Sequence, residues 1–365
     1  MIEGARHSGT TDSKTAAGQQ LARLIVDTTR GGVVDPSAET LGDYLTRWLA
    51  GKEKSQAVRT HEIQDGHLQR VILPTIGARR LQKLSPADLR RLFDHCNREG
   101  LGASSQRQVH QSLISALGEA HRLELVTLNV AEIVKPAPAR GKERKGLPTF
   151  TPEEAAAFLA AAREDWRGPF FVFTLSTGMR RGEVTGLRWQ DVGLEGGTAR
   201  VQEIVTDSTA GSSITTPKTG HSRRTAYLSP DTVALLRAVR ADQAQQAEAL
   251  AGPVKGHAKG YERKRPWADS GRVFTNAFGA TLDPHNLRRD MARICEAARV
   301  RYLPIHGLRY TYASLSLRRG VPVEVVSKQL GHASVAFTLT QYRTVFQSER
   351  EDWALNLDDL LTVQK

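Results

Sequence analysis

The amino-acid sequence predicts a mainly α-helical protein with two domains, a helical one followed by one that mixes helices with a small antiparallel sheet. Apolar residues recur at helical spacing from Thr40 to about Val134, with few strand signals. Further along, residues 198–205 and 222–229 alternate apolar and polar side chains as strands do. A segment rich in proline, glycine and basic residues, 135–148, separates the two regions and is expected to be a linker.

Residues 36–134 are expected to form the helical domain, preceded at 1–35 by a polar tail and a helix. Thr40 is a suitable N-cap for a helix over 41–50, because its hydroxyl can accept a hydrogen bond from a free backbone N–H group. Ser85, followed directly by a proline, marks the start of another helix.

Two apolar stripes are expected to supply the core of this domain. The first is followed by Pro74, which is predicted to end its helix because proline lacks the backbone N–H group of a helix interior. The stripes consist of Ile63, Leu68, Val71 and Ile72, and of Val109, Leu113, Ala116 and Leu117.

Residues 149–365 are expected to form the second domain together with a C-terminal tail. Thr151, a proline and Glu154 make a capping box that predicts a helix start. The strand-like segments are expected to be joined by a turn-rich connection, 206–221, and the polar segment 251–271 to be a surface loop. Helices are expected at 168–178, 231–250, 286–300 and 306–320.

Composition indicates a basic protein of a reducing compartment. Lys and Arg number 51 against 39 Asp and Glu, for a formal charge of +12. This excess suits a polyanionic partner such as a nucleic acid, although a solvated basic surface is the alternative. Cys96 and Cys295 lie far apart in helix-like segments and fit buried small hydrophobic residues better than a disulfide or zinc site. No apolar run has the length of a membrane helix and no signal-peptide core is present, so a cytoplasmic protein is expected.

Several basic residues are candidate DNA contacts, each of which would serve equally well as an exposed charge. The basic linker would either cross the backbone of a duplex or remain a solvated loop. The candidates are Arg59, Arg107 and Arg288 in the domains and Lys142, Arg144 and Lys145 in the linker.

Familiar metal and nucleotide motifs are absent from the sequence. There is no HExxH or CxxC set, no GxxxxGK[ST] phosphate loop and no GxSxG nucleophile motif. A metal-dependent nuclease and an ATP-driven enzyme are therefore disfavoured, and neither a metal nor another cofactor is expected.

A set of cationic and imidazole residues, followed by a tyrosine, remains. Its members are Arg180 in STGMRRGEVTGLRW, Lys218 in TTPKTGHSRRTAYL, His306 and Arg309 in PIHGLRYTYASL, His332 in KQLGHAS and Tyr342 in TLTQYRTV. Phosphoryl transfer depends mainly on positioning and on stabilising charge at the phosphate oxygens, which arginine does with paired N–H groups. A tyrosine oxygen can be the attacking atom, and the exchange of one phosphoester for another needs no ATP.

These segments resemble the motifs of the tyrosine recombinase family, the phage-type integrases. TGMRRGEVTGLRW is similar to the family pattern TGxRxGExxxLxW, and TPKTGHSRRTAYL to TPKTxxSxRxxxL; HGLR, LGH and the late tyrosine also match. The resemblance covers about residues 40–350, and the motifs in this order are specific. It implies a SAM-like core-binding domain, a catalytic domain of the tyrosine recombinase fold, and a site-specific recombinase that integrates or excises a mobile element.

The resemblance also implies roles for the reacting groups. Tyr342 would attack the scissile phosphate, form a 3′-phosphotyrosyl bond and release a 5′-hydroxyl. Arg180 and Arg309 would bind the non-bridging oxygens. Without the resemblance, an arginine can be a surface charge and a tyrosine an ordinary packing residue.

The remaining site residues have assisting roles by the same resemblance. Lys218 would protonate the departing oxygen, His306 would assist proton transfer at the tyrosine, and His332 would donate a hydrogen bond to the phosphate. Glu183, three residues after Arg180, would support the site as a carboxylate behind the reacting groups. Their ordinary alternatives are a solvated loop lysine, structural histidines and a first-turn helix charge.

The implied partners are double-stranded DNA carrying attachment sites, three further copies of the chain in a DNA-bound homotetramer, and an excisionase or DNA-bending protein. Residues 1–35 lack the strands of the family's arm-binding domain, so either this domain is a degenerate remnant or the chain begins late. The segment 344–361 is expected to pack either on a neighbour in the tetramer or on its own domain. A non-catalytic DNA-binding protein on the same fold and a type IB topoisomerase-like enzyme remain alternatives.

Overall fold

The structure is a computed structural model that describes most of the chain in two compact units, Met1–Glu143 (unit 1) and Arg144–Lys365 (unit 2). The boundary between the units falls inside the segment 135–148. The described residues are Ser13, Gly18, 36–137, 148–208, 211–216, 223–251 and 266–342. Four expected segments lie wholly or mostly outside these residues: the helix within 1–35, the linker, the loop 251–271 and the segment 344–361.

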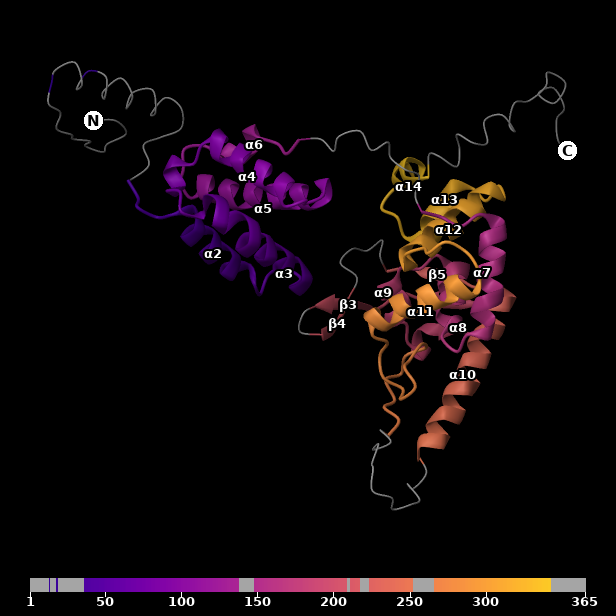
Figure 1. The fold of residues 1–365 in the computed structure, drawn as a ribbon. Coiled ribbons are helices and arrows are strands. Elements are labelled where there is room, and N and C mark those ends of the chain that lie inside the picture. Colours follow the sequence, from indigo (N-terminus) through magenta and orange to yellow (C-terminus); the bar gives the residue numbers. More distant parts are fainter. Residues whose placement is uncertain are drawn as a thin grey trace, which may run out of the picture. The chain divides into compact units, whose positions relative to one another are not determined.

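Unit 1 is a set of helices around one apolar core (Figure 1). The predicted caps are confirmed: the Thr40 hydroxyl accepts a hydrogen bond from the Asp43 N–H group, and Ser85 forms a capping box with Asp88. The four residues of the second predicted stripe are at most 1% exposed. The helices are α2 (Leu41–Lys52), α3 (Val58–His67), the π-helix η1 (Leu68–Gly77), the 3-10 turn η2 (Leu81–Lys83), α4 (Pro86–Arg98), α5 (Ala103–Arg122) and α6 (Val130–Ile133).

The prediction that Pro74 ends its helix is wrong, because the chain continues through it as η1. In a π-helix the hydrogen bonds reach five residues back, so the carbonyl group that a proline ring would strike in an α-helix is displaced. The hydroxyl of Thr75 donates to the Val71 carbonyl oxygen at 2.6 Å and occupies an acceptor in this turn. Burial of Val71 and Ile76 in the core favours the continued helix over an early stop.

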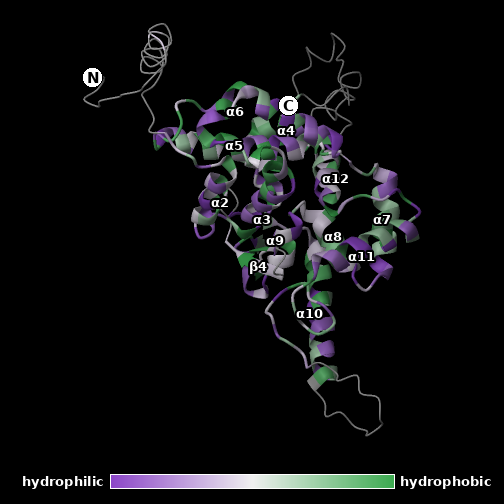
Figure 2. Cartoon of the chain, turned by 60° about the vertical axis from the view of Figure 1, so that its left-hand side comes forward, coloured by the Kyte–Doolittle hydropathy of each residue, from purple (hydrophilic) through white to green (hydrophobic). Residues whose placement is uncertain are grey.

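Unit 2 is built around the apolar helix α8 (Gly168–Thr177), which packs against α7 (Pro152–Glu164), α10 (Pro230–Ala251) and α12 (Ile305–Arg318). The capping box of Thr151 and Glu154 begins α7, as predicted. The end of α10 extends away from the other helices of the unit (Figure 1), and hydrophilic and hydrophobic residues alternate along it (Figure 2). The other helices are α9 (Arg181–Gly186), the 3-10 turn η3 (Trp189–Asp191), α11 (Pro284–Ala297), α13 (Val323–Leu330) and α14 (Val335–Gln341).

Two small antiparallel sheets complete the described part of unit 2. The first has the strand order β1 (Val192–Gly193), β2 (Thr198–Arg200), β5 (Thr225–Tyr227), and the second is the hairpin of β3 (Ile204–Ser208) and β4 (Gly211–Thr215). The single strand expected at 198–205 is therefore two strands in different sheets, and the expected turn-rich connection contains β4. Glu203 lies at the break, where Arg188 and Arg272 bind its two carboxylate oxygens at 2.5 and 2.6 Å and anchor the chain between the sheets.

Helix α9 lies directly against β3 because two glycines remove side chains from the contact. A Cβ atom at Gly182 would be 2.6 Å from the Val205 carbonyl oxygen, and one at Gly186 would be 2.6 Å from that of Glu203. The glycines are four residues apart and share one helix face. They fix the base of the β3–β4 hairpin to a helix that begins immediately after Arg180.

The two cysteines are free and buried, as predicted, one in the core of each unit. Burial raises the pKa of both the Cys96 and the Cys295 thiol. Within the described ranges, none of the helices combines the length and the apolar character needed to span a membrane.

Candidate active site

The structure brings six of the seven predicted active-site residues together in unit 2. They come from the start of α9, the first two turns of α12, the turn after α13 and the end of α14. They are Arg180, Glu183, His306, Arg309, His332 and Tyr342, and each lies close enough for its charge or ring to act on others of the set. The seventh, Lys218, lies outside the described residues.

Glu183 is the buried anion of the site. Its carboxylate accepts hydrogen bonds from the Arg180 backbone N–H at 2.9 Å, from Arg180 Nη1 at 2.8 Å, and from Arg224 Nη1 and Nη2 at 3.1 and 2.8 Å. Burial acts to raise the pKa of Glu183, but the hydrogen bonds and charges of Arg224 and Arg180 outweigh it and lower that pKa to about 2. The carboxylate is therefore ionised at neutral pH, while the Arg180 side chain stays 39% exposed and accessible to an anion.

Arg309 lies beneath the site and is only 2% exposed. Its Nη1 donates to the Gly178 carbonyl oxygen and its Nη2 to that of Leu330, both at 2.8 Å. These carbonyls stand at the ends of α8 and α13, where helix carbonyls lack partners within the helix and carry partial negative charge. Burial and the positive charge of Arg180 lower the pKa of Arg309 to about 9, so the group remains charged at neutral pH.

His306 stands on the first turn of α12, one turn before Arg309 on the same face. Its ring meets the ring of Tyr310 edge to face, with 4.7 Å between centroids. Partial burial of the ring and the charges of Arg309 and Arg180 lower its pKa to about 4. The imidazole is therefore neutral at physiological pH and can accept a proton.

His332 follows Gly331, which ends α13 in the left-handed conformation with φ +67°. The Nδ1 atom lies 2.7 Å from the Thr338 hydroxyl, which orients the ring. Burial and nearby guanidinium charges, that of Arg309 first, lower the pKa of His332 to about 4. A second neutral imidazole thus borders the site.

Tyr342 caps α14 and is 1% exposed. Its ring lies nearly parallel to that of His332, 6.5 Å away, and 6.2 Å from the ring of Tyr310. Its hydroxyl oxygen is buried without a hydrogen-bond partner among the described residues. Burial raises the pKa of the phenol, against the opposing charge of Arg309. The candidate nucleophile is therefore packed beside the cationic groups in its protonated form.

Arg224 is a member of this site that sequence reasoning missed. It stands six residues after Lys218 in the same motif, and its side chain is 7% exposed. Besides pairing with Glu183, its Nε donates to the Gln329 carbonyl oxygen at 2.7 Å. The signal that could have found it is the arginine in the SxR part of the motif, which falls on Arg224 and not on its neighbour Arg223; its burial and its pairing with Glu183 appear only when the chain is folded.

The three described candidates for DNA contact are exposed. Arg59 forms an ion pair with Glu62 at 3.2 Å, and Arg107 Nε donates to the Ala103 carbonyl oxygen at 3.2 Å. Arg288 is exposed on α11. All three side chains are thus on the surface of their unit. Contact between these three residues and DNA remains a prediction. Lys142, Arg144 and Lys145 lie outside the described residues.

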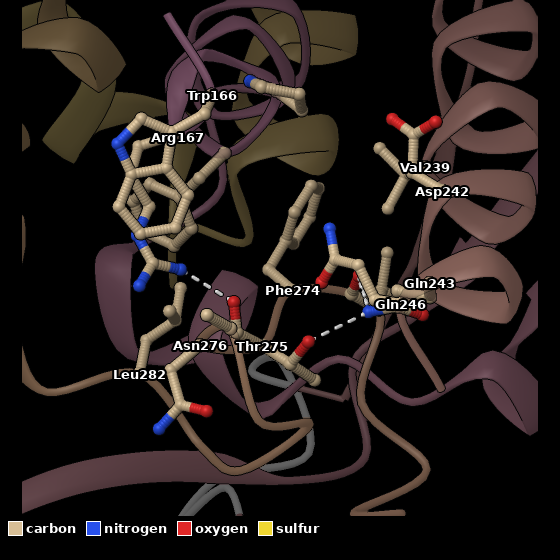
Figure 3. A pocket seen from close by; sticks show the side chains of 14 residues that line it. Trp166, Arg167, Val239, Asp242, Gln243, Gln246, Phe274, Thr275, Asn276 and Leu282 are labelled. Atoms are coloured by element: carbon tan, nitrogen blue, oxygen red, sulfur yellow. Dashed lines mark hydrogen bonds between the residues drawn. The ribbon is translucent and has the colours of Figure 1, made fainter. Parts of the chain in front are cut away.

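A separate pocket in unit 2 is lined by none of the candidate active-site residues (Figure 3). Two side chains of the lining bind Thr275: Arg167 Nη1 donates to the Thr275 carbonyl oxygen at 2.5 Å, and Gln243 Nε2 donates to the Thr275 hydroxyl at 3.1 Å. The labelled lining also includes Trp166, Val239, Asp242, Gln246, Phe274, Asn276 and Leu282.

Comparison with known proteins matches residues 148–349 to the phage integrase family. An integrase of Streptomyces ambofaciens is 29% identical over 360 residues, which cover 96% of this chain and 88% of the relative. A XerC-like tyrosine recombinase of Caldanaerobacter subterraneus subsp. tengcongensis is 26% identical over 341 residues, covering 90% of this chain and 85% of the relative.

Solved structures share the fold. The Tn1549 transposon integrase in complex with a circular intermediate DNA aligns with a TM-score of 0.69 and 16% identity, covering 87% of this chain and all of that one. The λ integrase tetramer bound to a Holliday junction aligns with a TM-score of 0.57 and 16% identity, covering 98% and 92%. The predicted mainly α fold, with small antiparallel sheets, is confirmed.

Proposed function

The chain belongs to the phage integrase family and is a site-specific DNA recombinase, and we propose that it cuts and rejoins DNA through a covalent bond between Tyr342 and a 3′-phosphate. The observation that carries the proposal is the convergence of two guanidinium groups, two neutral imidazoles and one tyrosine from four separate segments. Any one of these groups has ordinary structural uses. Together they supply what phosphoryl transfer to a tyrosine needs.

In the proposed reaction Arg180 and Arg309 bind the non-bridging oxygens of the scissile phosphate and stabilise the charge that builds up on them. The Tyr342 oxygen forms a bond to phosphorus while the bond from phosphorus to the 5′-oxygen breaks. The phenolic proton passes to His306, which is neutral and able to accept it. Lys218 supplies a proton to the departing 5′-oxygen. One phosphoester replaces another, so the reverse attack by a 5′-hydroxyl rejoins the strand.

The burial of Tyr342 sets a condition on this reaction. Its hydroxyl is enclosed by protein atoms in the structure of the free chain, so a phosphate cannot reach it there. Cleavage therefore requires a displacement of α14 on binding DNA. Such a displacement would also bring the Tyr342 phenol close to the phosphate and to the Arg180 and Arg309 side chains that bind it. These positive charges would offset the effect of burial on the pKa of the phenol.

The proposed partners follow from the reaction. Recombination exchanges strands between two duplexes, so four copies of the chain, one at each cleaved strand, would assemble on two attachment sites. Residues 36–134 would bind the core site and residues 149–365 would carry the chemistry. Arg59, Arg107 and Arg288, together with the linker residues Lys142, Arg144 and Lys145, would contact DNA, and an excisionase or DNA-bending protein would assist. No metal or nucleotide cofactor takes part.

The test is capture of the covalent intermediate. A duplex carrying the element's own attachment site, identified from DNA that flanks the gene, is nicked near the cut so that the cleaved end diffuses away. The chain and a Tyr227→Phe control, whose substituted side chain is 73% exposed, should form a protein–DNA adduct, and Tyr342→Phe should form none. An equal amount of adduct from Tyr342→Phe would overturn the assignment of the nucleophile. Relaxation of plasmids that lack an attachment site would instead favour a topoisomerase-like enzyme.

A further inference from the structure

Arg224 donates hydrogen bonds to two other residues of the protein, Glu183 and Gln329. Two N–H groups meet the two oxygens of Glu183 at 3.1 and 2.8 Å, and Nε meets the Gln329 carbonyl oxygen at 2.7 Å. The side chain is 7% exposed. Its Nε, Nη1 and Nη2 atoms therefore all donate to Glu183 or Gln329, whereas the Arg180 side chain, which shares the same carboxylate, is 39% exposed.

The bond to Gln329 belongs to a connection between β5, with the residue before it, and the end of α13. The side-chain amide of Gln329 donates to the Tyr227 carbonyl oxygen at 3.1 Å, and the Tyr227 N–H group donates back to the Gln329 side-chain oxygen at 3.3 Å. A Cβ atom at Gly331 would be 2.8 Å from Arg224 Cδ, so the guanidinium stem packs directly on the glycine turn. His332 is the next residue, and its position therefore depends on this contact.

Arg224 also determines how the charge of Glu183 is shared. A buried carboxylate needs a compensating cation, and here two arginines flank it. Arg224 binds both carboxylate oxygens of Glu183 and so compensates its negative charge. The positive charge of Arg180 is therefore left to attract a phosphate. Without Arg224, Glu183 would either be neutralised by Arg180 alone or take up a proton, and both changes would weaken the phosphate site.

We propose that Arg224 is a positioning residue for strand transfer, which holds Glu183 ionised and fixes the turn that carries His332, and so sets Arg180 and His332 at the phosphate site without touching DNA. The inference rests on the proposed function and adds to it a residue that connects two of the groups that would bind phosphate.

The experiment compares Arg224→Met, which keeps the stem and removes the charge, with Arg224→Lys, which keeps a charge and loses the fork. Arg237→Met is the matched control, because Arg237 pairs with Glu195 on an exposed surface. Single-turnover cleavage of the nicked attachment-site duplex is measured from pH 5 to 9, and affinity for the same duplex is measured by mobility shift.

Arg224→Met should cleave about 100-fold more slowly with unchanged affinity, since a small misplacement of catalytic groups has an effect of that order. Its rate should also fall more steeply toward pH 5 than the rate of the parent chain, because Glu183 takes up a proton in this range only when Arg224 is missing. Arg224→Lys should be intermediate and Arg237→Met unchanged. A wild-type rate in Arg224→Met would overturn the proposal, as would a loss of affinity equal to the loss of rate with no change in the pH profile.

A measurement without DNA separates this inference from the proposed function. Hydrogen exchange at the backbone amides of residues 329–332 should be faster in Arg224→Met than in the parent chain. If the parent chain forms no adduct, the proposed function fails, but faster exchange still supports the connection to α13. Unchanged exchange in Arg224→Met overturns the positioning role whether or not the adduct forms.

Discussion

Glutamine at position 183 would remove the buried negative charge of the site while keeping its shape. The pKa of Glu183 is about 2 in the folded protein against an ordinary value of 4.5, a difference that corresponds to about 3 kcal/mol. At pH 7 the Glu183→Gln variant should therefore lose about 3 kcal/mol of the free energy of unfolding of unit 2. This agrees with the general cost of removing one partner from a buried ion pair, about 3–5 kcal/mol.

The pH dependence identifies the cause of the loss. Because the pKa of Glu183 is lower in the folded than in the unfolded protein, its ionised form stabilises the fold above about pH 4.5, and this stabilisation is lost as the pH falls toward 2. Glutamine cannot titrate. The difference between the parent chain and Glu183→Gln should therefore be full at pH 7 and should shrink steadily below pH 4.5.

Urea unfolding of the full chain at pH 7, 5, 4 and 3, followed by circular dichroism and tryptophan fluorescence, measures this difference. The transition of unit 1 serves as an internal reference, because Glu183 lies in unit 2. Glu195→Gln is the matched control: its carboxylate is 93% exposed, and surface pairs contribute at most about 1 kcal/mol. A difference between the parent chain and Glu183→Gln that stays constant from pH 7 to 3 would refute the role of the ionised carboxylate.

Three further predictions concern the site and its surroundings. DNA binding at pH 5.5 should take up protons, because His306 and His332 have pKa values of about 4 in the free chain and a bound phosphate raises them; calorimetry in buffers of different ionisation enthalpy measures the uptake, and equal heats would contradict it. Gly186→Ala should destabilise unit 2 by about 1–3 kcal/mol in urea unfolding, since its Cβ would strike a backbone oxygen at 2.6 Å, whereas Gly196→Ala, which has open space around it, should have a far smaller effect. Formation of the covalent adduct should be unchanged by EDTA, and a loss that magnesium restores would show that the reaction needs a metal.

Local signals predicted much of the fold. The helix starts at Thr40, Ser85 and Thr151 were predictable because a cap depends only on residues three positions apart. Tertiary contacts decided the rest. Pro74 stops an isolated α-helix, but burial of its neighbours maintains a wider one. The strand break at Glu203 depends on arginines distant in the sequence, which no alternating pattern reveals.

The same division holds for the site. Each candidate site residue was predicted from the motif that contains it. The order of the motifs indicated that these residues belong to one active site. The burial of Tyr342 and the pairing of Glu183 with Arg224 depend on how the segments fold together, so neither could be read from the motifs. The motifs therefore predicted which groups would meet, and the structure adds which of them are exposed to a substrate.

The glycine face of α9 has a consequence for engineering the surface of unit 2. Since Gly182 and Gly186 fix the base of the β3–β4 hairpin, the exposed positions of β4, Ser212 and Ile214, can be varied without moving the helix that follows Arg180. A library randomised at those two positions would explore new surface chemistry on an unchanged support. The same library extended to either glycine would consist mostly of chains that lose the support itself.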